Sequence, residues 1–129
     1  MPVKVVDASA VAALLFVEAE ADLVVGLFGD DDLVAPSLLG FELANICLKK
    51  IRAHPADRDR LVNAFTTLDD LAIRTTEIAQ HRVLDLAQRT GLSAYDASYL
   101  SLALDLDAAL ITLDKRLAAA ARKLAVPLR

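Results

Sequence analysis

The chain has 129 residues, enough for one domain over residues 1–129, and a net charge of −4 that argues against non-specific nucleic-acid binding but allows a local basic patch. One cysteine excludes an internal disulfide, and the lack of a long apolar stretch excludes a membrane span and a signal peptide, which together predict a cytoplasmic protein. A hydrophobic fraction of 56% and a mean hydropathy of +0.44 indicate an oligomer or an obligate partner.

The first predicted strand begins at Val3 and stops abruptly at Asp7. Valines favour a strand. Asp7 is placed either to cap the following helix or to line an acidic site at the carboxyl end of the strand. The segment Ala10–Val17 is apolar almost all round and predicts a helix that is covered on more than one side. A second helix is expected to reach about Phe28 and to end at Gly29, and this helix pair is the candidate interface.

A strand and two helices are predicted over the next part of the chain. The segment Leu33–Pro36 forms a short strand, and its proline ends the hydrogen-bonded ladder. Ser37 is the expected N-cap of a helix from about Leu38 to Arg52. After a break at His54-Pro55, a further helix is expected from Asp57 to about Leu68.

Two faces of the helix that follows Ser37 differ in character. Glu42, Asn45 and Lys49 lie at helical spacing and share one polar face. The apolar row beside them identifies its cysteine as a small core side chain, and its members are Leu39, Leu43 and Cys47.

The second half of the chain alternates between strand and helix patterns. The expected elements are a strand at Leu71–Thr75, a helix at Glu77–Thr90 capped by Thr76 and closed by Gly91, a helix from Ser93 to about Leu104, a strand at Ala108–Leu113 that stops at Asp114, a helix at Lys115–Lys123 and an edge strand at Ala125–Leu128. Such alternation implies an α/β fold in which helices cover both faces of a parallel sheet.

The most basic stretch follows the second predicted strand. One interpretation is a solvated face, and the other is contact with phosphate groups. Its members are Lys49, Lys50, Arg52, Arg58 and Arg60.

Four carboxylates lie near strand ends or helix starts. Asp7 and Asp114 end the first and fourth predicted strands, whereas Glu42 and Asp96 lie near the starts of helices. Each has a structural explanation, because the two strand-end aspartates suit helix caps, Asp96 suits the third position of a capping box and Glu42 favours the positive end of its helix. A parallel sheet brings strand ends and helix starts to one rim, so all four acids can converge there.

A bound cation is the simplest compensation for such a gathering of like charges. Two carboxylates ~4 Å apart repel by roughly 1 kcal/mol in water and ~4 kcal/mol at an effective dielectric constant of 20. All-oxygen ligands suit Mg²⁺ or Mn²⁺ rather than zinc or copper. The chain has no glycine-rich phosphate loop, and neither His54 nor His81 lies near a predicted strand end. Metal-dependent phosphodiester chemistry therefore fits best.

Four segments carry a resemblance to a known family. They are Val-Val-Asp7-Ala-Ser9, Pro36-Ser-Leu-Leu-Gly-Phe-Glu42-Leu-Ala-Asn45, Leu92-Ser-Ala-Tyr95-Asp96-Ala-Ser-Tyr99-Leu and Leu110-Ile-Thr112-Leu-Asp114-Lys-Arg-Leu117. In this order and spacing the chain resembles PIN domains, in particular the VapC toxins of VapBC toxin–antitoxin pairs. The resemblance implies a three-layer α/β/α sandwich with a central, mostly parallel sheet of four to five strands. It also implies Mg²⁺-dependent endoribonuclease activity.

The resemblance further implies roles for individual residues. Asp7, Asp96 and Asp114 are expected to bind Mg²⁺, or Mn²⁺ as a substitute, most directly. Glu42 would ligate a second ion or orient the attacking water. The supporting polar residues are Ser9, Asn45 and Thr112. The side chains expected to steer RNA phosphates are Lys49, Lys50, Arg52, Arg58, Lys115 and Arg116. Tyr95 and Tyr99 are interpreted as packing residues rather than base-stacking ones.

Partners follow from the same resemblance. It implies a VapB-like antitoxin that covers the apolar early helices and inserts a basic side chain into the acidic pocket. It also implies a homodimer, within a possible larger toxin–antitoxin assembly. Two alternatives stay open: a housekeeping PIN nuclease of RNA maturation, and a non-catalytic module whose acidic pocket only docks basic partners.

Overall fold

The centre of the molecule is a four-stranded, all-parallel sheet, as seen in a computed structural model that describes residues 2–129. The strand order is β3-β2-β1-β4, so β1 lies in the middle. Val5 in β1 pairs with Val34 on one side and with Leu110 on the other. The strand bounds are Val3–Val6 for β1, Asp32–Pro36 for β2, Arg74–Thr76 for β3 and Ala109–Ile111 for β4.

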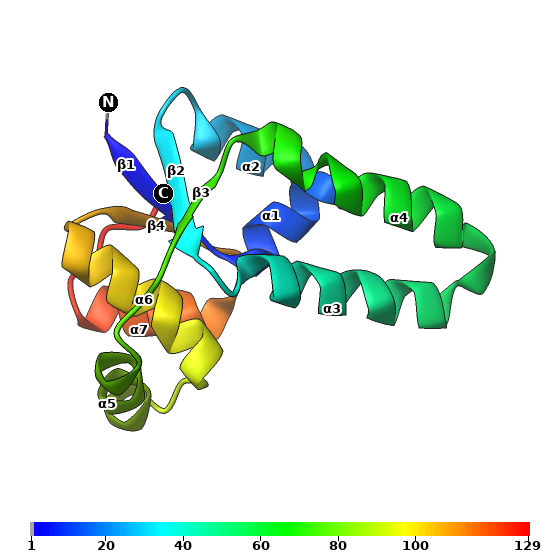
Figure 1. The fold of residues 1–129 in the computed structure, drawn as a ribbon. Helices are drawn as coiled ribbons and strands as arrows, with labels where there is room; N and C mark the ends of the chain where they lie inside the picture. Colours follow the sequence, from blue (N-terminus) through cyan, green and yellow to red (C-terminus); the bar gives the residue numbers. More distant parts are fainter. Residues whose placement is uncertain (1) are drawn as a thin grey trace.

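Helices cover both faces of this sheet, which confirms the predicted α/β architecture. Figure 1 shows α5, α6 and α7 on one side of the strands and α1 to α4 on the other. Within residues 2–129, no helix is long and apolar enough to cross a membrane. The helix bounds are Ala8–Leu15 for α1, Ala21–Phe28 for α2, Leu39–Ala53 for α3, Arg58–Thr66 for α4, Gln80–Thr90 for α5, Ala94–Leu106 for α6 and Lys115–Lys123 for α7, with short 3-10 helices at Pro55–Asp57 and Thr67–Leu71.

Helix α6 is the main support of the sheet. It packs against β1, β2 and β4, and every residue from position 97 to 103 is buried. Leu100, Leu110 and Val5 are each fully buried in the core that these elements share. Helix α6 therefore fixes the position of its own first turn relative to the strand ends.

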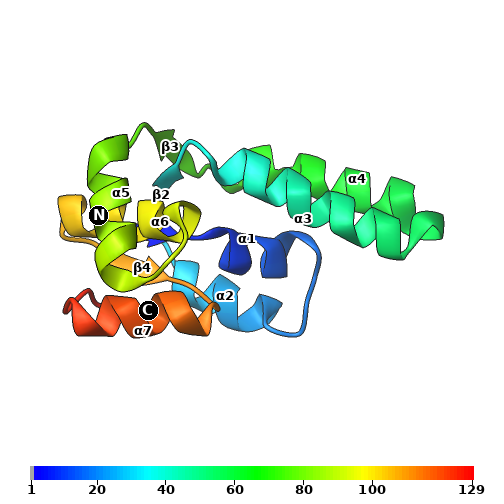
Figure 2. The same ribbon diagram turned by 90° about the horizontal axis from the view of Figure 1, so that it is seen from below.

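Helices α3 and α4 form an antiparallel pair that projects from the body of the molecule (Figures 1 and 2). The pair packs along the predicted apolar row of α3, whose members Leu39, Leu43 and Cys47 are all buried. The cysteine is thus a core side chain, as predicted.

Helix α1 is buried by the chain itself rather than left open as part of an interface. Six of its eight residues are buried, and it packs against α2 and α3. The exposed apolar side chains of this region lie after α1 and on α2, and they are Val17, Leu23 and Val25. The predicted interface is therefore wrong for α1 and stays a prediction for these three residues.

Several predicted boundaries and caps are wrong. The strand expected at Leu71–Thr75 begins only at Arg74, because Thr67–Leu71 forms a 3-10 helix. Neither Ser37 nor Thr76 caps a helix, since the Ser37 N–H donates to the Thr76 carbonyl oxygen (2.9 Å) where β2 and β3 end. The edge strand expected at 125–128 is reduced to one parallel bridge between Leu128 and β4.

Candidate active site

Hydroxyl groups join the carboxyl ends of β1 and β4. Thr112 Oγ1 donates to Asp7 Oδ2 (2.5 Å), and Ser9 Oγ donates to Asp7 Oδ1 (2.7 Å). The same two hydroxyls accept from the backbone, Thr112 from Asp114 N and Ser9 from Leu113 N (2.9 Å each). Asp7 is therefore held against the turn that carries Asp114, as expected for acids at the ends of neighbouring parallel strands.

Asp7 and Asp114 are also helix caps. Asp7 Oδ1 accepts from Ala10 N at the start of α1 (3.0 Å), and Asp114 Oδ1 accepts from Leu117 N at the start of α7 (3.0 Å). The capping predictions for these two aspartates are confirmed. Because each carboxylate oxygen has two acceptor sites, capping leaves both groups able to bind a further ligand.

The other two acids come from the first turns of α3 and α6. Ser93 caps α6 as predicted and accepts from Asp96 N (3.1 Å). Tyr99 lies one turn further along α6, and its hydroxyl donates to Glu42 Oε1 on α3 (2.6 Å). This bond ties the first turn of α3 to α6.

Burial and mutual repulsion raise the pKa values of three of the four acids. Burial is the main cause for Asp7, whose pKa is lowered in part by hydrogen bonds from Thr112, Ala10 and Ser9 and raised by the charge of Asp114. Burial also raises the pKa of Glu42, against the Tyr99 hydrogen bond, and the charges of Asp96 and Asp7 raise it further.

Asp96 completes this set of interacting charges. Its pKa is raised by burial and by the charge of Asp114, and is lowered by Arg116 and by a hydrogen bond with Ser93. Asp7, Glu42 and Asp96 thus each have a pKa raised in part by the charge of another of the four acids. They share one region of the molecule, and they do not face opposite sides.

The donor set fits a hard divalent cation. All the candidate ligands are carboxylate oxygens, which Mg²⁺ and Mn²⁺ prefer. Among residues 2–129, no lysine, arginine or histidine forms an ion pair with any of the four acids, so no direct ion pair compensates their charge. Over the same residues, no three His, Cys, Asp or Glu side chains already lie close enough together to hold a metal ion. Ligation would therefore require the side chains to draw closer together.

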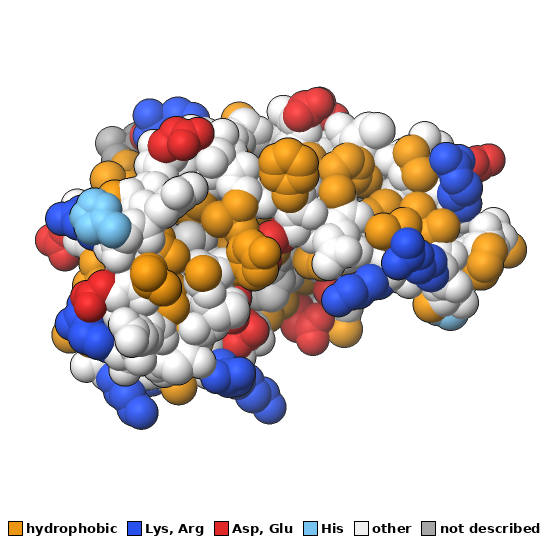
Figure 3. Space-filling view, turned by 60° about the horizontal axis from the view of Figure 1, so that its bottom comes forward, with side chains coloured by type: hydrophobic (Ala, Val, Ile, Leu, Met, Phe, Trp, Pro, Cys, Tyr) orange, Lys and Arg blue, Asp and Glu red, His pale blue; other side chains and the backbone are white. Residues whose placement is uncertain are grey.

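On the face of the molecule drawn in Figure 3, acidic groups lie near the middle, with Lys and Arg side chains on both sides. Arg116, in the first turn of α7, donates to the Gly91 carbonyl oxygen (2.9 Å) and lowers the pKa of Asp96. Lys115 beside it is exposed. Lys50 instead forms an ion pair with Glu18 and lies over the Phe16 ring: its Nζ is 2.9 Å from Glu18 Oε2 and 5.4 Å from the ring centre.

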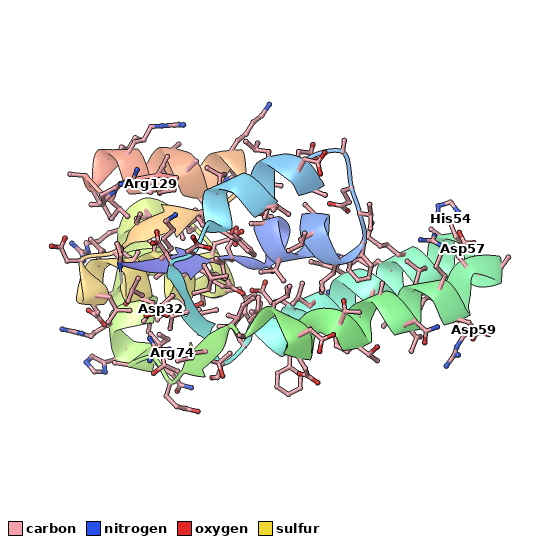
Figure 4. The ribbon with its side chains drawn as sticks, turned by 90° about the horizontal axis from the view of Figure 1, so that it is seen from above. Asp32, His54, Asp57, Asp59, Arg74 and Arg129 are labelled. Atoms are coloured by element: carbon pink, nitrogen blue, oxygen red, sulfur yellow. The ribbon has the colours of Figure 1, made fainter. Side chains whose placement is uncertain are left out.

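Two other predicted residues are less closely connected to the acids. Arg58 lies between Asp57 and Asp59, which Figure 4 labels at the tip of the α3–α4 pair, and it pairs with Asp59 (3.2 Å). The structure therefore does not bring Arg58 to the acidic region. Asn45 is exposed one turn after Glu42, and within residues 2–129 no hydrogen bond joins the two side chains.

The two tyrosines of α6 have different surroundings. Tyr99 is 1% exposed, which confirms its packing role, but sequence reasoning missed its hydrogen bond to Glu42. The available signal was spacing, because Tyr99 follows Asp96 by three residues and shares its helical face. Tyr95 is 64% exposed, so its interpretation as a packing residue is wrong.

Tyr99→Phe is expected to lower RNA cleavage by about tenfold or more, a typical cost of losing a partner that orients a ligand. The hydroxyl lowers the pKa of Glu42, so its removal should shift the acid limb of the pH–rate profile to higher pH. The measurement is kcat/KM as a function of pH. Tyr95→Phe, which removes an exposed hydroxyl on the same helix, is the control, and an unshifted acid limb in Tyr99→Phe would contradict the role.

Comparisons with known proteins agree with the resemblance seen in the sequence. The family model "PIN domain" matches residues 4–123. VapC ribonuclease Mb0985 of Mycobacterium bovis and Ribonuclease VapC9 of Mycobacterium tuberculosis are each 36% identical over 118 residues, covering 88% of this chain and 87% of the relative. The crystal structure of PAE2754 from Pyrobaculum aerophilum superposes with a TM-score of 0.76 at 28% identity, over 92% of this chain and 79% of that one.

Proposed function

Because the chain belongs to the PIN-domain family, we propose that it is a metal-dependent endoribonuclease whose catalytic residues are Asp7, Glu42, Asp96 and Asp114. One observation carries the proposal: acids from four separate segments repel one another, and three of them have raised pKa values. Titratable groups perturbed in this way concentrate at functional sites. The relatives named as VapC ribonucleases support the choice of RNA as substrate.

The four acids divide into ligands and an orienting group. Asp7, Asp96 and Asp114 hold a divalent cation, Mg²⁺ first and Mn²⁺ as a substitute, and Glu42 ligates a second ion or orients the attacking water. A cation held there supplies Lewis-acid activation of the phosphoryl group and lowers the pKa of bound water. Ser9 and Thr112 fix the carboxylate of Asp7, and Tyr99 fixes that of Glu42.

The similarity to VapC ribonucleases also supports the proposal that this protein is the toxin of a toxin–antitoxin pair. The partner is a VapB-like antitoxin that covers exposed apolar side chains near the N-terminus and offers a basic group to the acids. The exposed positions are Val17, Leu23 and Val25. A homodimer of the nuclease, within a larger toxin–antitoxin assembly, completes this hypothesis.

The function is tested by incubating the purified protein with total RNA in Mg²⁺, in Mn²⁺ and in EDTA. We expect cleavage only with metal, and sequencing of the new 5′ ends identifies the sites. Tight partner binding without metal-dependent cleavage would favour the alternative of an acidic docking module. Neighbouring genes separate the two nuclease hypotheses, since a small antitoxin reading frame favours the toxin over a housekeeping enzyme.

Lys49→Ala combined with Arg52→Ala is expected to weaken RNA binding and its dependence on salt. Both side chains are exposed on one face of α3, and neither forms an ion pair with any residue in the range 2–129. Two lost phosphate contacts should reduce the slope of log K against log salt by about 1.4, at roughly 0.7 per contact with single-stranded RNA.

The matched control for this pair removes two arginines at the tip of the same helical hairpin, Arg58→Ala and Arg60→Ala. Both already pair with neighbouring aspartates. The control should leave the salt slope unchanged. An unchanged slope in the Lys49–Arg52 double variant would identify those residues as a solvated face.

A further inference from the structure

Both strongly exposed aromatic side chains of the protein directly precede a candidate catalytic acid. The chain has four Phe, two Tyr and no Trp. Phe41 is 82% exposed and Tyr95 is 64% exposed, whereas Tyr99 and two of the phenylalanines are buried and Phe65 is half-buried. Large aromatic surface left in water contributes nothing to folding, so its placement calls for another explanation.

The two rings border the acids from different helices. Phe41 precedes Glu42 in the first turn of α3, and Tyr95 precedes Asp96 in the first turn of α6. The Tyr99–Glu42 hydrogen bond (2.6 Å) joins α6 to this first turn of α3. On the face of the molecule drawn in Figure 3, exposed hydrophobic side chains lie beside acidic ones.

Tyr95, the residue before Asp96, also lines a groove of about 410 Å³. Its apolar lining includes Pro36, Leu38 and Leu84, and Leu84 is itself 65% exposed. Polar side chains at the same groove, among them Gln80, provide hydrogen-bonding groups. An apolar lining with a few polar groups beside it suits a nucleobase, which has two apolar faces and a polar edge.

We propose that Phe41 and Tyr95 are base-stacking residues that bind unpaired RNA bases on nucleotides flanking the scissile phosphate, with one base entering the groove beside Tyr95. This rests on the proposed function, because it takes RNA as the substrate. Aromatic rings accept the face of any base, which gives affinity and alignment with limited sequence preference. The stacked bases hold the intervening phosphate over the acids, which on their own repel it.

The test uses short single-stranded RNA oligonucleotides that carry 2-aminopurine, whose fluorescence changes when the base stacks on a ring. The protein carries Asp7→Asn so that the RNA stays intact, since asparagine retains the helix cap. Phe41→Ala and Tyr95→Ala are each expected to raise Kd by about tenfold, or ~1.4 kcal/mol, within the range for one stacked base. Each should also diminish the fluorescence change.

Two further variants separate stacking from general effects. Tyr95→Phe keeps the ring and should bind like its parent, and Leu106→Ala removes an exposed apolar side chain from the far end of α6 and should have no effect. An unchanged Kd in both alanine variants overturns the proposal and favours contact of Phe41 and Tyr95 with a protein partner instead of RNA. A weaker Kd with an undiminished fluorescence change also overturns it. Failure of the nuclease function itself would show separately, as absence of cleavage by the wild-type protein.

Discussion

Asp96→Asn is expected to lower kcat/KM for metal-dependent RNA cleavage by at least about 100-fold, since even residues that only support a metal ligand cost 10- to 100-fold. Asp96 is half-buried in the first turn of α6; burial and the charge of Asp114 raise its pKa, and its own charge raises the pKa of Glu42. Asparagine keeps the shape of the side chain but removes the charge that a divalent cation requires. Initial cleavage rates at fixed Mg²⁺ provide the measurement.

Asp105→Asn is the matched control on the same helix. Asp105 is exposed and pairs with Arg82 at the surface (2.9 Å), an interaction worth at most about 1 kcal/mol. This variant makes the same chemical change away from the acids and should retain full activity. If Asp96→Asn were equally active, Asp96 would be only a favourable first-turn residue of α6.

Mg²⁺ is expected to stabilise the protein strongly near neutral pH and weakly near pH 4. In the metal-free protein the pKa values of Asp7, Glu42 and Asp96 lie above their ordinary values of 3.8, 4.5 and 3.8. The folded state therefore binds more protons than the unfolded state in the window above pH 4. Stability from these groups is fully present below the ordinary values and is lost as the pH rises through the raised ones.

Bound Mg²⁺ should remove this loss, because it compensates the charges that burial and repulsion make unfavourable. At a Mg²⁺ concentration of 100 Kd the added free energy of unfolding is about 2.7 kcal/mol, and it declines in acid as protons compete for the ligands. Calorimetric unfolding across a pH series, with and without Mg²⁺, measures both effects. Parallel curves would contradict a shared metal site.

Strongly patterned segments of the sequence predicted the fold well. The run from Val3 to Val6 forms the central strand, and the helix expected at Lys115–Lys123 has those bounds in the structure. Gly91 closes α5 with a φ of 77°, a conformation that glycine adopts without strain. In these places local preference and tertiary packing favour the same structure.

The errors fall where the local pattern is weak. Strand β3 has three exposed residues at the edge of the sheet, so no buried alternation marks its bounds. Ser37 and Thr76 have the right chemistry for caps, but their backbones bond to each other across β2 and β3. A pairing between residues so distant in sequence cannot be read from either segment alone.

The same limit applies to the acidic region. Asp7 and Asp114 were predictable as neighbours because parallel strands end at one rim of a sheet. The hydrogen bond from Tyr99 to Glu42 was not, because it depends on how α3 packs against α6. Nor could the exposure of Tyr95 be predicted, since its helix is otherwise buried over most of its length.

The double role of Asp7 bears on how this protein and its relatives could lose activity during evolution. Its carboxylate caps α1 and accepts from Ser9 and Thr112, so deleting it would cost the fold as well as the chemistry. An inactive descendant should therefore carry asparagine here more readily than alanine. Retention of a capping residue, aspartate or asparagine, at this position is thus poor evidence that a homologue is an enzyme, whereas Asp96, which caps no helix, is the more informative position.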